Sequence, residues 1–141
     1  GEAAAVAEAG TVLKEAGARR VLPLKVSGPF HSPMMRPAGE ELAKVFAGVS
    51  MNPLKVPYVA NINAEVITDC GRIEGLLVEQ VIESVRWQQS VENMIRQGVD
   101  TFIEIGPGRT LSGFMRKIDR NVKVYNIQTV EDAEKVCQEL K

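Results

Sequence analysis

The second half of the chain alternates segments of strand type with segments of helical periodicity, and this alternation most constrains the fold. Two short apolar runs, 101–105 and 122–127, are typical of buried strands, and a helical pattern lies between them. A last helix is expected over 129–140, where Thr129 and Asp132 can form a capping box. Strands that alternate with helices predict an α/β fold with a largely parallel sheet.

The first part of the chain is less regular. Composition and breakers predict helices at 3–16, 37–47, 73–85 and 90–98, the last with Ser90 as its N-cap. Strands are predicted at 19–26, 56–62 and 65–68, the first as an edge strand because it contains Pro23. Asn63-Ala64 would form a turn between the last two, and 27–33 reads as a loop rich in breakers.

Composition excludes several classes of function. The chain has 141 residues and a formal net charge of −1, so it lacks the basic field of a nucleic-acid-binding protein. A single histidine excludes a multi-histidine zinc site, and no metal is expected. No apolar run reaches membrane-spanning length, and no signal peptide is found. Cys70 and Cys137 match no metal-ligand spacing, so both are interpreted as reduced thiols of a cytoplasmic protein.

The loop from Gly28 to Pro33 contains His31, the residue with the clearest chemical potential. A histidine on a rigid loop after a strand is well placed to accept a proton and then return it near neutral pH. The alternative is that a lone loop histidine is a surface or capping residue. The chain begins with Gly1 rather than Met, which suggests a fragment, a processed chain or part of a longer protein.

Four segments together resemble the malonyl-CoA:acyl carrier protein transacylases. The stretch from Leu24 to Met35 resembles the histidine loop of that family. Three further motifs follow in the family order: Asn52, Pro53, Pro57 and Asn61; Val85, Trp87, Ser90 and Val91; and Glu104 to Arg109 with Leu111-Ser112-Gly113. The resemblance covers essentially the whole chain and implies the C-terminal portion of an α/β hydrolase-like acyltransferase domain. Residues 1–26 would be a remnant of its ferredoxin-like small subdomain, and residues 27–141 part of the large domain.

The resemblance implies covalent catalysis by a serine and a histidine, without a metal or redox cofactor. A serine attacks malonyl-CoA, coenzyme A leaves, and the phosphopantetheine thiol of acyl carrier protein takes the malonyl group. His31 matches the family histidine that activates first the serine and then the thiol. Gln80 matches the residue whose main-chain carbonyl orients that histidine.

The family's nucleophile motif G-H-S-x-G is absent, and the sequence contains no G-x-S-x-G. In the family order this motif lies upstream, as do the arginine that pairs with the malonyl carboxylate and a glutamine-rich loop of the oxyanion hole. A base without these groups is expected to be inactive toward malonyl-CoA. The missing N-terminal half is therefore an expected partner.

Phe30 and Asn61 are candidate substrate-binding residues. In related acyltransferase domains a phenylalanine at the position of Phe30 accompanies malonyl, and a serine there often accompanies methylmalonyl. Simple loop packing is the alternative for Phe30, since one pocket wall discriminates a methyl group by only about 1–3 kcal/mol. Asn61 is expected either to contact the histidine loop or only to shape its own turn.

Arg19 and Arg20 are candidate docking residues for the acidic carrier protein, as family members often carry basic residues there. The alternative is a solvated pair at a helix C-terminus. Gly106-Pro107-Gly108 is interpreted as a tight turn rather than a phosphate loop, because no Lys-Ser/Thr pair follows.

Malonyl transfer in fatty acid synthesis is the function that these features predict. Two alternatives stay open: an acyltransferase domain of a polyketide or fatty acid synthase, and a non-catalytic fragment that binds a carrier protein.

Overall fold

The computed structural model describes residues 1–140, which form two compact units. The first consists of Gly1–Ile62 and Val66–Val85, and the second of Asn63–Glu65 and residues 86–140. The predicted subdomain boundary at Val26 does not coincide with this division and stays a prediction.

The first unit is mainly helical. Its helices are α1 (Ala3–Glu15), α2 (Arg36–Phe46) and α3 (Ile73–Ile82), with short 3-10 turns η1 (Pro33–Met35) and η2 (Cys70–Arg72). Strands β1 (Tyr58–Val59) and β2 (Val66–Ile67) pair antiparallel, as the turn at Asn63-Ala64 predicts. The Asn63 side-chain oxygen accepts a hydrogen bond from the Glu65 backbone N–H at 3.0 Å and so tightens this turn.

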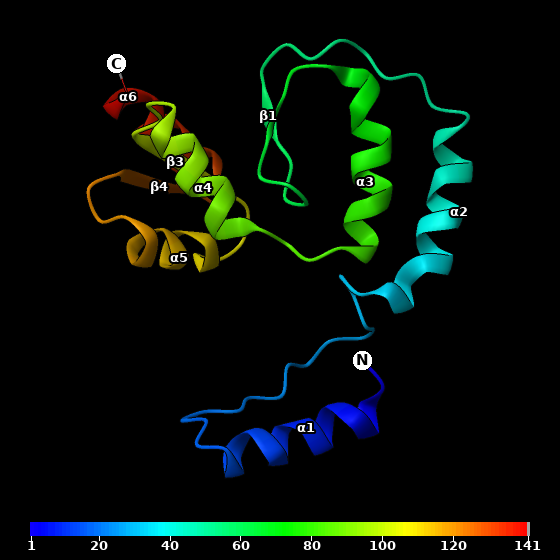
Figure 1. Ribbon diagram of the computed structural model, residues 1–141. Coiled ribbons are helices and arrows are strands. Elements are labelled where there is room, and N and C mark those ends of the chain that lie inside the picture. The colour runs from blue at the N-terminus through cyan, green and yellow to red at the C-terminus, as the bar shows by residue number, and fades with distance from the viewer. Residues whose placement is uncertain (141) are drawn as a thin grey trace. The chain divides into compact units, whose positions relative to one another are not determined.

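The core of the first unit lies between the strand pair and α3. Ala60, Ile67 and Leu76 are buried there, and Leu54, Tyr58, Ile62 and Ile73 pack around them. Helices α2 and α3 lie side by side (Figure 1). A Cβ on Gly39 of α2 would lie only 3.2 Å from Ile82, so glycine allows the two helices to approach closely.

Two predictions for local structure are wrong. Residues 19–26 form no strand, and no neighbouring strand lies beside them in residues 1–140; the apolar side chains of Leu24 and Val26 are exposed instead. A strand needs a hydrogen-bonding neighbour, which sequence pattern alone does not provide. Ser90 is not an N-cap but a buried residue inside helix α4 (Trp87–Arg96), where its hydroxyl donates to the Arg86 carbonyl at 2.9 Å.

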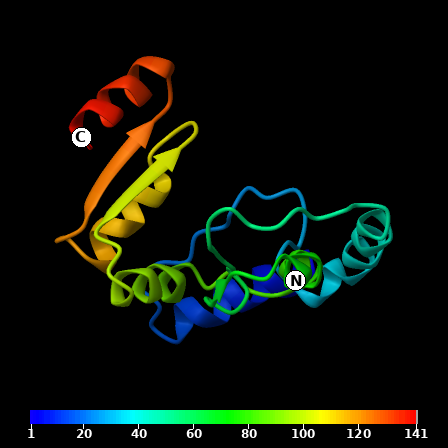
Figure 2. The same cartoon turned by 90° about the horizontal axis from the view of Figure 1, so that it is seen from above.

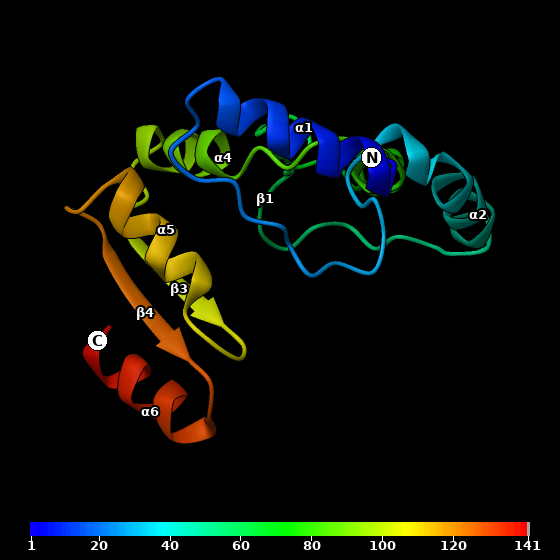
Figure 3. The same cartoon turned by 90° about the horizontal axis from the view of Figure 1, so that it is seen from below.

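The second unit contains the predicted α/β element. Strands β3 (Thr101–Ile105) and β4 (Lys123–Ile127) are parallel, with Thr101 opposite Lys123 and Ile105 opposite Ile127. Helix α5 (Thr110–Ile118) connects them, and α6 (Val130–Glu139) follows β4. The two strands run in the same direction in Figure 2, and Figure 3 shows α5 and α6 on either side of them. The predicted capping box of Thr129 and Asp132 is present at the start of α6. The α/β fold class is confirmed.

Candidate active site

The candidate base His31 lies in a tightly folded loop before η1. Its backbone is left-handed, with φ 58°, a region that residues other than glycine adopt at a cost. The Ser32 hydroxyl donates to the Pro29 carbonyl at 2.7 Å, and the Met35 N–H donates to the Ser32 carbonyl at 3.0 Å. These local bonds shape the loop on the two sides of His31.

The C-terminal turn of helix α3 holds His31 in place. The His31 backbone N–H donates to the Val81 carbonyl at 3.2 Å, and Nδ1 of its ring lies 2.8 Å from the Gln80 carbonyl. The last four carbonyls of a helix have no donor within the helix, so they are available to a nearby group. The negative end of the helix dipole also favours a donor at this position.

The contact with Gln80 determines which nitrogen of the ring is free. A carbonyl oxygen only accepts hydrogen bonds, so Nδ1 must carry the hydrogen in this contact. In the neutral ring, Nε2 is then the unprotonated nitrogen. The His31 side chain is exposed, and no hydrogen bond to Nε2 is found within residues 1–140. The arrangement therefore presents a free acceptor nitrogen to the solvent, as a general base requires.

The other predicted site residues are less closely tied to His31. Phe30 is 54% exposed, and its ring folds back toward Gly28. Asn61 is partly buried after β1, and no hydrogen bond connects it to the histidine loop in the described part of the chain. Arg19 and Arg20 are exposed in the segment after α1. The structure thus joins His31 with Gln80 and leaves the roles of the other four as predictions.

A second polar cluster, in the other unit, surrounds Glu104 at the end of β3. One carboxylate oxygen accepts from the Leu111 N–H at 3.1 Å; the other accepts from the Ser112 N–H at 2.8 Å and the Ser112 hydroxyl at 2.6 Å. The Asn126 amide of β4 donates to the same carboxylate at 2.9 Å and to the Ser112 hydroxyl at 2.8 Å. Glu104 therefore caps the N-terminus of α5 and ties this helix to both strands.

The hydrogen bonds at Glu104 lower the pKa of its carboxyl group from 4.5 to about 2, with the Ser112 hydroxyl as the largest cause. A carboxylate with so low a pKa is a poor base and does not activate the Ser112 hydroxyl. The cluster is structural rather than a nucleophile–base pair. The sequence motif that contains Glu104 and Ser112 did not reveal this cluster, although Glu104 and Asn126 are polar residues at paired positions of the two strands.

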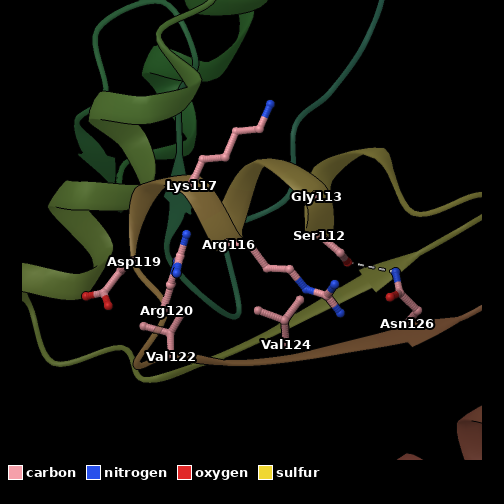
Figure 4. A pocket seen from close by; sticks show the side chains of 9 residues that line it. All are labelled: Ser112, Gly113, Arg116, Lys117, Asp119, Arg120, Val122, Val124 and Asn126. Atoms are coloured by element: carbon pink, nitrogen blue, oxygen red, sulfur yellow. Dashed lines mark hydrogen bonds between the residues drawn. The ribbon is translucent and has the colours of Figure 1, made fainter.

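A cavity with a volume of about 740 Å³ lies between α5 and β4 (Figure 4). Its lining includes Arg116, whose side chain extends along Val124, and Lys117, which points away. Its polar members Ser112 and Asn126 are already engaged with Glu104. This cavity belongs to the second unit and does not contain His31, so its size does not make it the candidate active site.

No group of histidine, cysteine, aspartate or glutamate side chains in residues 1–140 is arranged to hold a metal ion. None of the helices described there is both long and apolar enough to span a membrane.

Comparison with known proteins relates the whole chain to one group of enzymes. It is 42% identical over 141 residues to the malonyl CoA-acyl carrier protein transacylase of Bacillus subtilis, and it spans 44% of the length of that relative. The crystal structure of an MCAT from Streptococcus pneumoniae matches with a TM-score of 0.90 and 41% identity, over 99% of this chain and 45% of that one.

A third match is a malonyl-transacylase solved in complex with a type II polyketide synthase acyl carrier protein. It has a TM-score of 0.92 and 35% identity, and the match covers 99% of this chain and 45% of the solved one. No protein-family model matches the chain. The chain is thus a homologue of the malonyl CoA-acyl carrier protein transacylases and matches a C-terminal portion of them.

Proposed function

We propose that the complete protein transfers malonyl from malonyl-CoA to the phosphopantetheine thiol of acyl carrier protein, and that this chain supplies the base, His31. The observation that carries the proposal is the 2.8 Å contact between His31 Nδ1 and the Gln80 carbonyl, which leaves Nε2 free. The relatives named as transacylases support the same reaction.

In the proposed reaction, Nε2 of His31 removes the proton of a serine hydroxyl as its oxygen attacks the malonyl thioester. The imidazolium then returns the proton to the departing thiolate of coenzyme A. In the second half, Nε2 takes the proton of the phosphopantetheine thiol, whose sulfur attacks the malonyl-serine ester, and the proton returns to the serine oxygen. No oxidant, reductant or metal is needed for these steps.

The serine belongs to a region that this chain does not contain, since its sequence has no G-x-S-x-G. The chain by itself is therefore expected to be inactive. Its apolar exposure supports a need for further protein: Ile105 of β3 is 78% exposed and Leu24 79% exposed. Strands of a parallel sheet are normally covered on both faces. The N-terminal part of the homologous enzymes is the proposed cover.

Acyl carrier protein is the proposed macromolecular partner. A related transacylase has been solved with such a carrier. Arg19 and Arg20 offer a pair of exposed positive charges for an acidic partner. The carrier in that complex serves polyketide synthesis, so the same chemistry in either fatty acid or polyketide synthesis fits the proposal.

The test compares this chain alone with the same chain joined to, or mixed with, the region that carries the G-x-S-x-G motif. Malonyl transfer to acyl carrier protein should be absent from the chain alone and present in the combination. The combination should also be more soluble, because exposed apolar surface becomes covered. Turnover by the chain alone, with malonyl attached to one of its own serines, would contradict the proposal. A combination that binds carrier protein but transfers nothing would favour a non-catalytic binding role.

A further inference from the structure

We propose that the side chain of Gln80 is a positioning residue for His31. This inference rests on the proposed function, in which His31 is the base. The Gln80 main-chain carbonyl contacts the ring directly, but its side chain makes a separate bond. That bond holds the end of helix α3 in the shape that the histidine needs.

The Gln80 amide spans the C-terminal end of α3. Its Nε2 donates to the Glu83 carbonyl at 3.2 Å, three residues further along. The Glu83 N–H donates in turn to the Glu79 carbonyl at 2.8 Å. Glu83 has extended backbone, with φ −90° and ψ 156°, so the chain leaves the helix at this residue. The first extended residue is therefore held on both sides, by a backbone bond and by the Gln80 side chain.

The position of this exit determines whether the carbonyls of Gln80 and Val81 remain available. Helix ends fray because their last carbonyls lack donors. If the exit segment were free, the last turn could unwind, and the two carbonyls would no longer converge on His31. The ring would then be free to adopt either tautomer, including the one that places the hydrogen on Nε2.

The strained backbone of His31 makes it sensitive to such a change. A left-handed non-glycine residue persists only where its surroundings fix it. In residues 1–140, the His31 backbone N–H and its ring are both fixed by the same turn of α3. A substitution that loosens this turn therefore removes two constraints on His31 at once. Substitution of a surface glutamine elsewhere would affect only the residues next to it.

The experiment replaces Gln80 in the complete protein. Gln80→Met keeps the length of the side chain but removes the donor. Gln80→Lys restores a donor, since an ammonium group near a helix C-terminus can bond to the last carbonyls. Gln97→Met is the matched control: Gln97 is the C-cap of α4, and its amide donates to the Asn93 side chain at 3.2 Å.

The first readout is the ¹⁵N spectrum of the His31 ring, assigned by the signals that disappear in His31→Gln. The wild type should show the hydrogen on Nδ1, and Gln80→Met should increase the fraction of the Nε2–H form. The second readout is malonyl transfer. The net free energy of one neutral hydrogen bond corresponds to about a 2- to 12-fold change in an equilibrium or rate constant. In Gln80→Met, kcat should therefore fall by about that factor while KM changes little. Gln80→Lys should recover both, and Gln97→Met should alter neither.

An unchanged tautomer ratio and kcat in Gln80→Met would overturn the inference, and so would an equal change in Gln97→Met. A purely structural role would lower the unfolding temperature without moving the tautomer ratio, which also contradicts it. If the wild type transfers no malonyl but the ring signals respond as described, the proposed function fails and the positioning role stands.

Discussion

Each of the two units has an ionisable side chain at the end of a helix, one at a C-terminal end and the other at an N-terminal end. The two side chains differ in how many hydrogen bonds they make. His31 sits at the C-terminal end of α3, where its Nδ1 contacts the Gln80 carbonyl and no bond to Nε2 is described. Glu104 sits at the N-terminal end of α5, where backbone and side-chain donors surround both carboxylate oxygens. Each position agrees with the direction of the helix dipole, which favours donors at the C-terminus and anions at the N-terminus.

This difference fits the proposal that His31 is the reactive group, whereas Glu104 maintains structure. A reactive group needs one partner to orient it and one atom free to react, which is the condition of His31. A structural group needs all its hydrogen-bonding capacity used, which is the condition of Glu104. Changes near His31 should therefore alter catalysis more than stability, and changes near Glu104 should do the reverse.

The largest effect is expected from His31→Ala in the complete protein. Loss of the base should lower malonyl transfer by about 10²- to 10⁴-fold. The unfolding temperature should change little, because the side chain is exposed. Transfer assays and thermal unfolding of the same preparations measure both quantities. Activity within threefold of the wild type would show that His31 is not the base, and the proposed difference between the two regions would then be wrong.

A smaller effect is expected from Phe30→Ser, which opens space beside the proposed acyl group. The ratio of specificity constants for malonyl-CoA and methylmalonyl-CoA should shift toward methylmalonyl, by at most about 10- to 200-fold. Phe114→Ser is a suitable control, because Phe114 is an exposed phenylalanine of the second unit. If Phe30→Ser leaves the ratio unchanged, Phe30 only packs in the loop.

Arg19→Glu combined with Arg20→Glu should weaken the use of acyl carrier protein by about tenfold, because charge complementarity mainly raises the encounter rate. Acylation by malonyl-CoA should remain nearly normal, and this half-reaction serves as the internal control. Each half is assayed separately, at low salt, where the effect is greatest. An equal loss in both halves would indicate a folding defect or a contact with coenzyme A.

Glu104→Gln is expected to have the smallest effect on catalysis. Its main consequence should be a loss of stability that depends on pH. The pKa of Glu104 is lowered from 4.5 to about 2, so its stabilising contribution is complete above about pH 4.5 and is lost as pH falls toward 2. The difference in unfolding free energy between wild type and Glu104→Gln should therefore become smaller as pH falls from about 4.5 toward 2. Urea unfolding at a series of pH values measures it.

Glu139→Gln, an exposed change near the end of α6, is the matched control for this prediction and should show no such narrowing. If the gap between wild type and Glu104→Gln stays constant down to pH 2, the carboxylate is not held as the structure describes. If Glu104→Gln abolishes transfer at neutral pH while the fold remains intact, the division between a chemical and a structural region is wrong.

Local sequence determined the elements whose signals are complete within a few residues. The capping box of Thr129 and Asp132 and the turn at Asn63 agree with the structure, because their hydrogen bonds involve near neighbours. The strand at 101–105 is also present, but Ile103 and Ile105 are exposed rather than buried. The motif around His31 also indicated the family resemblance, which the homologues support.

Tertiary structure decided everything that depends on partners distant in the chain. Residues 19–26 have strand-like composition but no neighbouring strand in the described part, so they remain irregular. Ser90 resembles an N-cap, yet α4 begins earlier, at Trp87. The Glu104 cluster joins β3, α5 and β4, and no local pattern contains all three partners. Composition and spacing identified His31 as a candidate, and the resemblance named Gln80. Only the fold showed the 2.8 Å contact across 49 residues that leaves Nε2 free, because a ring tautomer is fixed by where a distant carbonyl lies.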